Sequence, residues 1–183
     1  EIYYGSDFRF GSEWAAHIGD RWDRNKIANI LKEVDFLTPQ GPEAQLNHKI
    51  SYFMEPGKDR LIRVHNLLLR HKCRYNLVYS HEKYLDILPA RASKGKAVRY
   101  ISYQWDIPLR NFLVCGDSGT DEEMLRGEPL AVVVGNYSRE LEVLRDCRRV
   151  FFAPSACAGG ILDGIRHYAF FDAPAGRRSG EGS

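Results

Sequence analysis

The stretch that decides the fold is Phe112-Leu-Val-Cys-Gly-Asp-Ser-Gly-Thr-Asp121-Glu-Glu-Met124. Its first four residues are apolar and typical of a strand, a short polar loop follows, and the last residues favour a helix. In an open α/β sheet, ligands bind at the loops beyond the carboxyl ends of the strands. This loop carries two carboxylates, Asp117 and Asp121, and its two glycines let the backbone turn tightly and approach a ligand. We therefore expect a ligand site here.

The two carboxylates have two interpretations. Neighbouring negative charges repel each other unless a cation lies between them, and a small number of hard oxygen ligands suits Mg²⁺. Asp117 and Asp121 are therefore candidate metal ligands. Alternatively, Asp117 forms an Asx-turn and Asp121 caps the following helix. Capping and metal binding can hold together, so both interpretations stay open.

The composition is that of an ordinary globular protein: 44% of the 183 residues are apolar and 27% are charged. A net charge of +2 gives no reason to expect nucleic acid or an anionic membrane as partner. No apolar run reaches the length of a transmembrane helix. The four cysteines are scattered without a Cys-x-x-Cys pair, which disfavours zinc and disulfides and favours a reducing environment. We therefore expect a cytoplasmic protein.

The first part of the chain predicts a small α+β domain with two helical segments on one face of an antiparallel sheet. Its apolar residues recur at helical spacing or alternate as in strands, and Asp23 is a candidate N-cap within the first helical segment. The predicted elements are a helix at 14–37, a strand at 46–54, a helix at 58–71, and strands at 74–79 and 84–88.

After Pro89 helices and strands alternate, which predicts βαβ units and a parallel sheet. The predicted helices are 94–105, 121–125, 138–145 and 159–170, and the strands are 111–115, 130–134 and 150–152. The expected domains are the end of a core strand and a linker at 1–11, a cap at 12–89, the core at 90–171 and a loose tail at 172–183. The chain begins without Met inside an expected strand, so we expect sequence upstream.

Further candidates follow from position. Lys94 stands in the first turn of a predicted helix whose N-cap is Ser93. A lysine there opposes the helix dipole, and a phosphate bound nearby would compensate for this cost. Alternatively, Lys94 is an exposed lysine that points away from the helix end. Asn136 follows a predicted strand and faces a ligand or makes a turn. Lys49 reaches from a cap strand towards a sugar or phosphate, or is a solvated sheet lysine. His48 is the one histidine of interest.

Several site classes are disfavoured by the sequence. Ser118 has no His or Asp at the spacing of a serine hydrolase. The chain contains neither the Gly-x-x-x-x-Gly-Lys-Ser/Thr motif of P-loops nor the Gly-x-Gly-x-x-Gly motif of dinucleotide-binding folds.

Lys94-Gly95, a later strand and then Gly116-Asp-Ser-Gly-Thr-Asp121 resemble the third and fourth motifs of the haloacid-dehalogenase-like phosphatases. The sucrose-phosphate phosphatases are similar over three stretches, and so is the phosphatase-like C-terminal domain of bacterial sucrose-phosphate synthases. The stretches are Tyr84-Leu-Asp-Ile-Leu-Pro-Ala-Arg-Ala-Ser-Lys-Gly-Lys-Ala-Val-Arg-Tyr100, Trp105-Asp-Ile-Pro108 and Val132-Val-Val-Gly-Asn136. The resemblance implies an α/β fold: the C-terminal half of a Rossmann-like parallel-sheet core plus an α+β cap domain.

The resemblance also implies a Mg²⁺-dependent sugar-phosphate phosphatase that converts sucrose-6-phosphate to sucrose and phosphate. In this family an aspartate of an Asp-x-Asp motif attacks phosphorus and forms an aspartyl-phosphate. The implied catalytic residues are Lys94, Asp117 and Asp121, with both aspartates as metal ligands and Lys94 on the phosphoryl oxygens. The residues expected to bind substrate are Lys49, Ser118 and Asn136.

The departure from the family is that no Asp-x-Asp motif occurs in the 183 residues. The fragment alone is therefore expected to be inactive and to need a missing N-terminal core segment as partner, for which the glycosyltransferase domain of a sucrose-phosphate synthase is one candidate. The alternative function is a non-catalytic or regulatory domain of such a synthase. Thr120 also stands where many relatives have Asn. A half-built parallel sheet further predicts aggregation, dimerisation or pairing with the missing segment.

Overall fold

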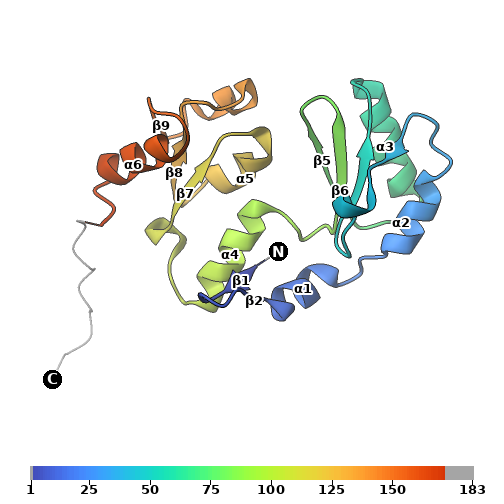
Figure 1. The fold of residues 1–183 in the computed structure, drawn as a ribbon, viewed down its shortest axis with the longest axis horizontal. Coiled ribbons are helices and arrows are strands. Elements are labelled where there is room, and N and C mark those ends of the chain that lie inside the picture. Colours follow the sequence, from blue (N-terminus) through green and yellow to red (C-terminus); the bar gives the residue numbers. More distant parts are fainter. Residues whose placement is uncertain (1, 172–183) are drawn as a thin grey trace. The chain divides into compact units, whose positions relative to one another are not determined.

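The computed structural model describes residues 2–171, so the predictions for Glu1 and for the tail 172–183 lie outside the described residues. The chain divides into two compact units, unit 1 over residues 1–100 and unit 2 over residues 101–183. Figure 1 shows the elements of each. The predicted bounds of cap and core stay predictions. No helix among residues 2–171 combines the length and the apolar character that crossing a membrane requires.

Unit 1 contains the antiparallel sheet that the alternation predicted. The sheet has the order β3-β4-β6-β5, and every neighbouring pair is antiparallel. Its strands are β3 (Thr38–Pro39), β4 (Ile50–Phe53), β5 (Asn76–Ser80) and β6 (Tyr84–Leu88). Helices α2 (Arg24–Leu31) and α3 (Lys58–Arg70) lie on one side of it (Figure 1). Their buried faces pack with the sheet into one core that includes Ile27, Leu31, Ile50, Val64, Leu68, Leu85 and Ile87.

The helix predicted at 14–37 is in fact two helices, α1 (Ser12–Gly19) and α2. The break lies at Arg21, whose φ of 58° is incompatible with a continuous right-handed helix. Asp23 then starts α2 as predicted, because its carboxylate accepts the backbone N–H of Lys26 at 2.9 Å. The apolar spacing gave no sign of the break, because apolar residues are buried on both helices. The segment after α2 leads into strand β3.

Two further segments of unit 1 differ from expectation. The strand predicted at 46–54 is shorter, because Leu46 and Lys49 bond each other's backbone across a tight turn before β4 begins. Tyr3–Tyr4 (β1), in the stretch expected to end a core strand, pairs antiparallel with Arg9–Phe10 (β2).

Unit 2 contains the predicted parallel sheet, with strand order β7-β8-β9. Its strands are β7 (Leu113–Gly116), β8 (Leu130–Val133) and β9 (Val150–Phe152), and its helices are α5 (Glu122–Leu125) and α6 (Cys157–His167). Helix α4 (Lys94–Gln104) begins in unit 1 and ends in unit 2. Ala131, Val132 and Val133 of β8 are fully buried, as a continuous apolar run predicts.

The helices of unit 2 differ in detail from prediction. Residues expected as a helix at 138–145 form a 3₁₀ helix at Arg139–Leu144, and the last helix starts earlier and ends sooner than predicted. Unit 2 has further 3₁₀ helices at Leu109–Asn111 and Gly119–Asp121, and unit 1 has one at Pro42–Ala44. Helix α6 packs very closely on β8, because a Cβ on Gly164 would lie 2.2 Å from a methyl group of Val132.

Candidate active site

The loop after β7, residues 117–121, is folded around one buried carboxylate and is called the acid loop below. Asp121 is only 3% exposed. Its Oδ2 accepts the backbone N–H groups of Asp117 at 3.1 Å and Ser118 at 3.2 Å, and the Ser118 hydroxyl at 3.3 Å. Asp121 stands at the N-cap position of α5, but its side chain makes no cap hydrogen bond to that helix, so the prediction that it caps the following helix is wrong. It instead completes the capping box of the 3₁₀ helix Gly119–Asp121, whose N-cap is Ser118. Gly116 makes room for it, since a Cβ there would lie 2.5 Å from the Cβ of Asp121.

Asp117 is exposed at the carboxyl end of β7. Its backbone carbonyl accepts the N–H of Ser138 at 2.7 Å, whereas its carboxylate has no hydrogen bond or ion pair with the described residues, so the Asx-turn interpretation is not supported. The buried Asp121 beneath it is the nearest acid in the loop. An exposed carboxylate beside a fixed second one fits Mg²⁺, which takes one or two carboxylates and completes its shell with water and phosphate oxygens. Within residues 2–171 no three His, Cys, Asp or Glu side chains form a metal-binding cluster.

Ser118 and Asn136 have structural contacts in unit 2. The Ser118 hydroxyl lies 2.9 Å from the Thr120 hydroxyl, inside the acid loop. The Asn136 side-chain oxygen accepts the N–H of Cys157, the first residue of α6, at 2.7 Å. Asn136 thus ties the end of β8 to α6, while the predicted substrate contacts of both residues stay predictions.

Lys49 and Lys94 line the same cavity of unit 1, of about 630 Å³, which is called the cationic pocket below. His48 lines it too, and its Nε2 lies so near Gly19 that a Cβ there would be 3.1 Å away. No carboxylate occurs among the described residues that line the pocket. The walls come from three separate segments: Phe10, Trp14, Ala15 and Ile18; Gln45 to Lys49; and Leu88, Ala92, Ser93, Lys94 and Ala97.

The two lysines are held differently. Lys49 lies in the turn before β4, where its ammonium is 3.9 Å from the carboxylate of Asp86. The other oxygen of Asp86 accepts the hydroxyl of the buried Ser51 at 2.6 Å. Lys94 is exposed at the first residue of α4. The N-cap of this helix is Ser93, as predicted, because its hydroxyl accepts the N–H of Lys96 at 3.1 Å.

Cys115 lies in β7, directly before the acid loop, and was not a predicted site residue. Burial raises the pKa of its thiol. A thiol with a raised pKa stays protonated at neutral pH, and only the thiolate is a good nucleophile. Cys115 is therefore not a candidate for the attacking group.

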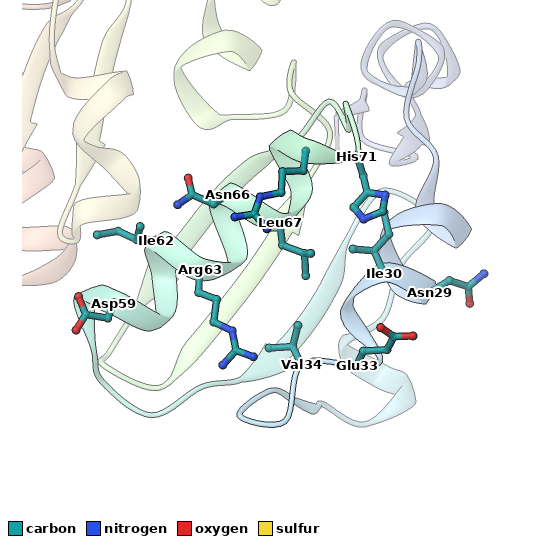
Figure 2. A pocket seen from close by; sticks show the side chains of 11 residues that line it. Asn29, Ile30, Glu33, Val34, Asp59, Ile62, Arg63, Asn66, Leu67 and His71 are labelled. Carbon is teal, nitrogen blue, oxygen red and sulfur yellow. The ribbon is translucent and has the colours of Figure 1, made fainter.

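Unit 1 has a second cavity, of about 790 Å³, between α2 and α3 (Figure 2). It is lined by acids and bases together, such as Glu33, Asp59 and Arg63, over the apolar side chains Ile30, Val34 and Leu67. None of the predicted site residues lines this cavity. We therefore assign it no part in the candidate chemistry, although it is the larger of the two.

Comparisons with known proteins identify the family. The model of the sucrose-6F-phosphate phosphohydrolase family matches residues 1–169. Sucrose-phosphatase 1 of Nicotiana tabacum is 32% identical over 180 residues, which are 92% of this chain and 42% of that protein. Mannosylfructose-phosphate phosphatase of Agrobacterium fabrum is 31% identical over 154 residues, covering 82% of this chain and 62% of the relative.

A solved structure supports the same assignment. The sucrose-phosphatase of a Synechocystis species, solved in complex with sucrose and phosphate, is 29% identical with a TM-score of 0.82 and covers 92% of this chain and 70% of that one. A haloacid dehalogenase-like hydrolase of Bacillus subtilis, 18% identical with a TM-score of 0.60, shows the fold alone. The chain spans 42% of the tobacco relative's length. The predicted resemblance and fold class are confirmed, and the chain belongs to the sucrose-6F-phosphate phosphohydrolase family.

Proposed function

We propose that the protein is a Mg²⁺-dependent phosphatase that hydrolyses sucrose-6-phosphate to sucrose and phosphate. The observation that carries the proposal is the cationic pocket, in which Lys94 and Lys49, whose ammonium lies 3.9 Å from Asp86, line one cavity. Two ammonium groups in such a cavity attract an anion. Apolar and aromatic walls with a few polar groups are typical of small-molecule sites, and Phe10 and Trp14 supply such a wall. A phosphorylated sugar has the matching chemistry.

The two lysines take different roles in this proposal. Lys94 is the first residue of an 11-residue helix, so its ammonium and the positive end of the helix dipole together favour a phosphoryl group. The ammonium then stabilises the negative charge that develops during transfer. Lys49, paired with Asp86, binds the sugar part or an outer phosphate oxygen. We propose that Ser118 and Asn136 contact the substrate as well. The bond of Asn136 to Cys157 uses only its side-chain oxygen.

The acid loop of unit 2 is the proposed metal-binding site. Asp117 and Asp121 are the proposed ligands of Mg²⁺, which when bound neutralises charge on the phosphoryl oxygens. Asp121 keeps the loop folded through the N–H groups of Asp117 and Ser118. The 183 residues contain no Asp-x-Asp motif. We propose that the attacking carboxylate belongs to a core segment outside them, with residues 12–89 as the cap and residues from 90 onward as part of the core.

In the proposed reaction a carboxylate oxygen forms a bond to phosphorus while the bond from phosphorus to the sugar oxygen breaks. The second aspartate of the missing motif gives its proton to the leaving sugar oxygen. Water then attacks phosphorus, and the bond from phosphorus to the attacking aspartate's oxygen breaks, which releases phosphate and restores the carboxylate. One proton of the water passes to the second aspartate. The cysteines Cys73, Cys115, Cys147 and Cys157 are free thiols, which supports the proposed cytoplasmic location.

The test uses the protein as its gene encodes it and follows phosphate release with and without Mg²⁺. We expect Mg²⁺-dependent release from sucrose-6-phosphate, and little release after EDTA. Mannosylfructose-phosphate, named in one relative, is the competing substrate. A higher kcat/KM for that substrate would contradict the proposed sugar while keeping the reaction class. Binding of sucrose-6-phosphate without turnover would instead favour the alternative, a regulatory phosphatase-like domain of a sucrose-phosphate synthase.

A further inference from the structure

The acid loop is held from outside by the segment that follows β8. Glu140, in the 3₁₀ helix Arg139–Leu144, accepts the backbone N–H of Gly119 on its Oε2 at 2.9 Å. The same oxygen lies 3.3 Å from the hydroxyl of Ser138. The backbone N–H of Ser138 donates to the carbonyl of Asp117 at 2.7 Å. Two points of the loop, residues 117 and 119, are therefore bonded to one neighbouring segment.

Gly119 shows that this contact needs a glycine for reasons of space. A Cβ on Gly119 would lie 2.3 Å from Oε2 of Glu140 and 3.0 Å from its Cδ. The φ of Gly119 lies outside the left-handed region, so its conformation alone does not require glycine. The missing side chain is what lets the carboxylate reach the N–H group.

We propose that Glu140 is a positioning residue that holds the acid loop in the conformation that binds Mg²⁺. The inference rests on the proposed function, because it assumes that Asp117 is a metal ligand. Asp121 fixes the loop from its buried side, whereas Glu140 fixes it from the exposed side. Without Glu140 the N–H of Gly119 donates to water, and the loop gains conformational freedom. Metal binding must then restrict the loop, and this entropy cost lowers the affinity. Mutation of a group that orients a metal ligand in this way typically lowers metal affinity about 10–100-fold.

The direct test is calorimetric titration of Mg²⁺ into the gene-encoded protein without substrate. We expect Glu140→Ala to raise the dissociation constant for Mg²⁺ by about 10-fold or more. Glu140→Gln keeps an oxygen acceptor for Gly119, so its dissociation constant should stay much closer to that of the unchanged protein. The control is Glu128→Ala, which removes an equal charge just before β8, away from the loop's end of that strand. Equal losses in the Ala and Gln variants would assign the effect to charge and overturn the proposal.

A double-mutant cycle with Gly119→Ala tests the contact itself. The new methyl group must push the Glu140 carboxylate away, so this variant alone should weaken Mg²⁺ binding much as Glu140→Ala does. In the Glu140→Ala background it should add little, because the carboxylate is already gone. Full additivity of the two changes would contradict the proposal.

Two further measurements separate the possible failures. If Glu140→Ala lowers the melting temperature of the metal-free protein but leaves the Mg²⁺ dissociation constant unchanged, Glu140 is merely structural and the inference is wrong. Asp117→Asn should strongly weaken Mg²⁺ binding. If it does so while Glu140→Ala has no effect, only the inference fails. If Asp117→Asn has no effect, or if the unchanged protein binds no Mg²⁺, the proposed function fails and the inference with it.

Discussion

The acid loop and the cationic pocket are built by the chain in opposite ways. The acid loop is one continuous run of five residues, closed on itself by the carboxylate of Asp121. The cationic pocket collects side chains from three segments that are far apart in the sequence. The first depends on hydrogen bonds within the loop and on two bonds to Ser138 and Glu140. The second depends on how α1, the turn before β4 and the start of α4 pack within unit 1. A substitution in the loop should therefore act on the metal, and one in the pocket on the substrate.

The largest expected effect separates binding from turnover. Residues 1–183 alone should release no phosphate from sucrose-6-phosphate, because the Asp-x-Asp motif that supplies the attacking carboxylate in the proposed mechanism does not occur among them. Calorimetry on the same sample should still detect the substrate in the cationic pocket, with Lys49→Ala weakening it. Phosphate release above the protein-free blank would contradict this prediction and place the attacking group among the 183 residues.

The next effect distinguishes the two lysines of the pocket. Lys94→Ala in the gene-encoded protein should lower kcat on the order of 100-fold, because its ammonium acts on charge that develops in the transition state. Lys49→Ala should mainly raise KM, since it removes binding shared by ground and transition states. Lys32→Ala, at an exposed position after α2, is the control. If both pocket variants change KM alone, Lys94 has no catalytic role.

A smaller effect concerns the packing of unit 2. Gly164→Ala places a methyl group 2.2 Å from Val132 and should lower the free energy of unfolding by about 1–3 kcal/mol, because α6 must move away from β8. Ala158→Ser, at an exposed position of the same helix, should have almost no effect. Urea denaturation measures both. An unchanged midpoint for Gly164→Ala would mean that α6 is not seated on β8 as described.

The smallest effect concerns the N-cap in unit 1. Asp23→Ala removes the acceptor of the Lys26 N–H at the start of α2 and should cost about 1 kcal/mol of stability. Asp23→Asn keeps an acceptor oxygen and should recover most of this loss. Thermal unfolding in the two variants gives the comparison. Equal losses would indicate that the charge of Asp23, and not its hydrogen bond, stabilises the helix.

The sequence predicted those features that depend on neighbouring residues. Alternation and apolar runs predicted both sheets, and single polar residues marked the N-caps Asp23 and Ser93. The break at Arg21 was missed because the helical spacing of apolar residues carries no signal for one left-handed residue. The strand predicted at 46–54 was too long because Asn47 and His48, which extend its alternation, lie in a turn.

The contacts between distant segments could not be predicted in the same way. Nothing in the spacing of Phe10 and Trp14 places them beside Lys49 and Lys94, since the pocket depends on tertiary packing. The contact of Glu140 with Gly119 joins residues 21 positions apart, which lie in two separate 3₁₀ helices. The one signal in the sequence was Gly119, which was expected to let the backbone turn tightly and instead makes room for the carboxylate of Glu140. The catalytic roles of Asp117 and Lys94 stay predictions from the resemblance.

The measurement that tests the central claim most directly is the rate of phosphate release from sucrose-6-phosphate by the gene-encoded protein and its Asp117→Asn variant, each titrated with Mg²⁺. The account predicts that the variant loses on the order of 100-fold or more in rate and that added Mg²⁺ restores little of it. An unchanged rate with an unchanged Mg²⁺ dependence would show that the acid loop does not hold the metal, and would contradict the account.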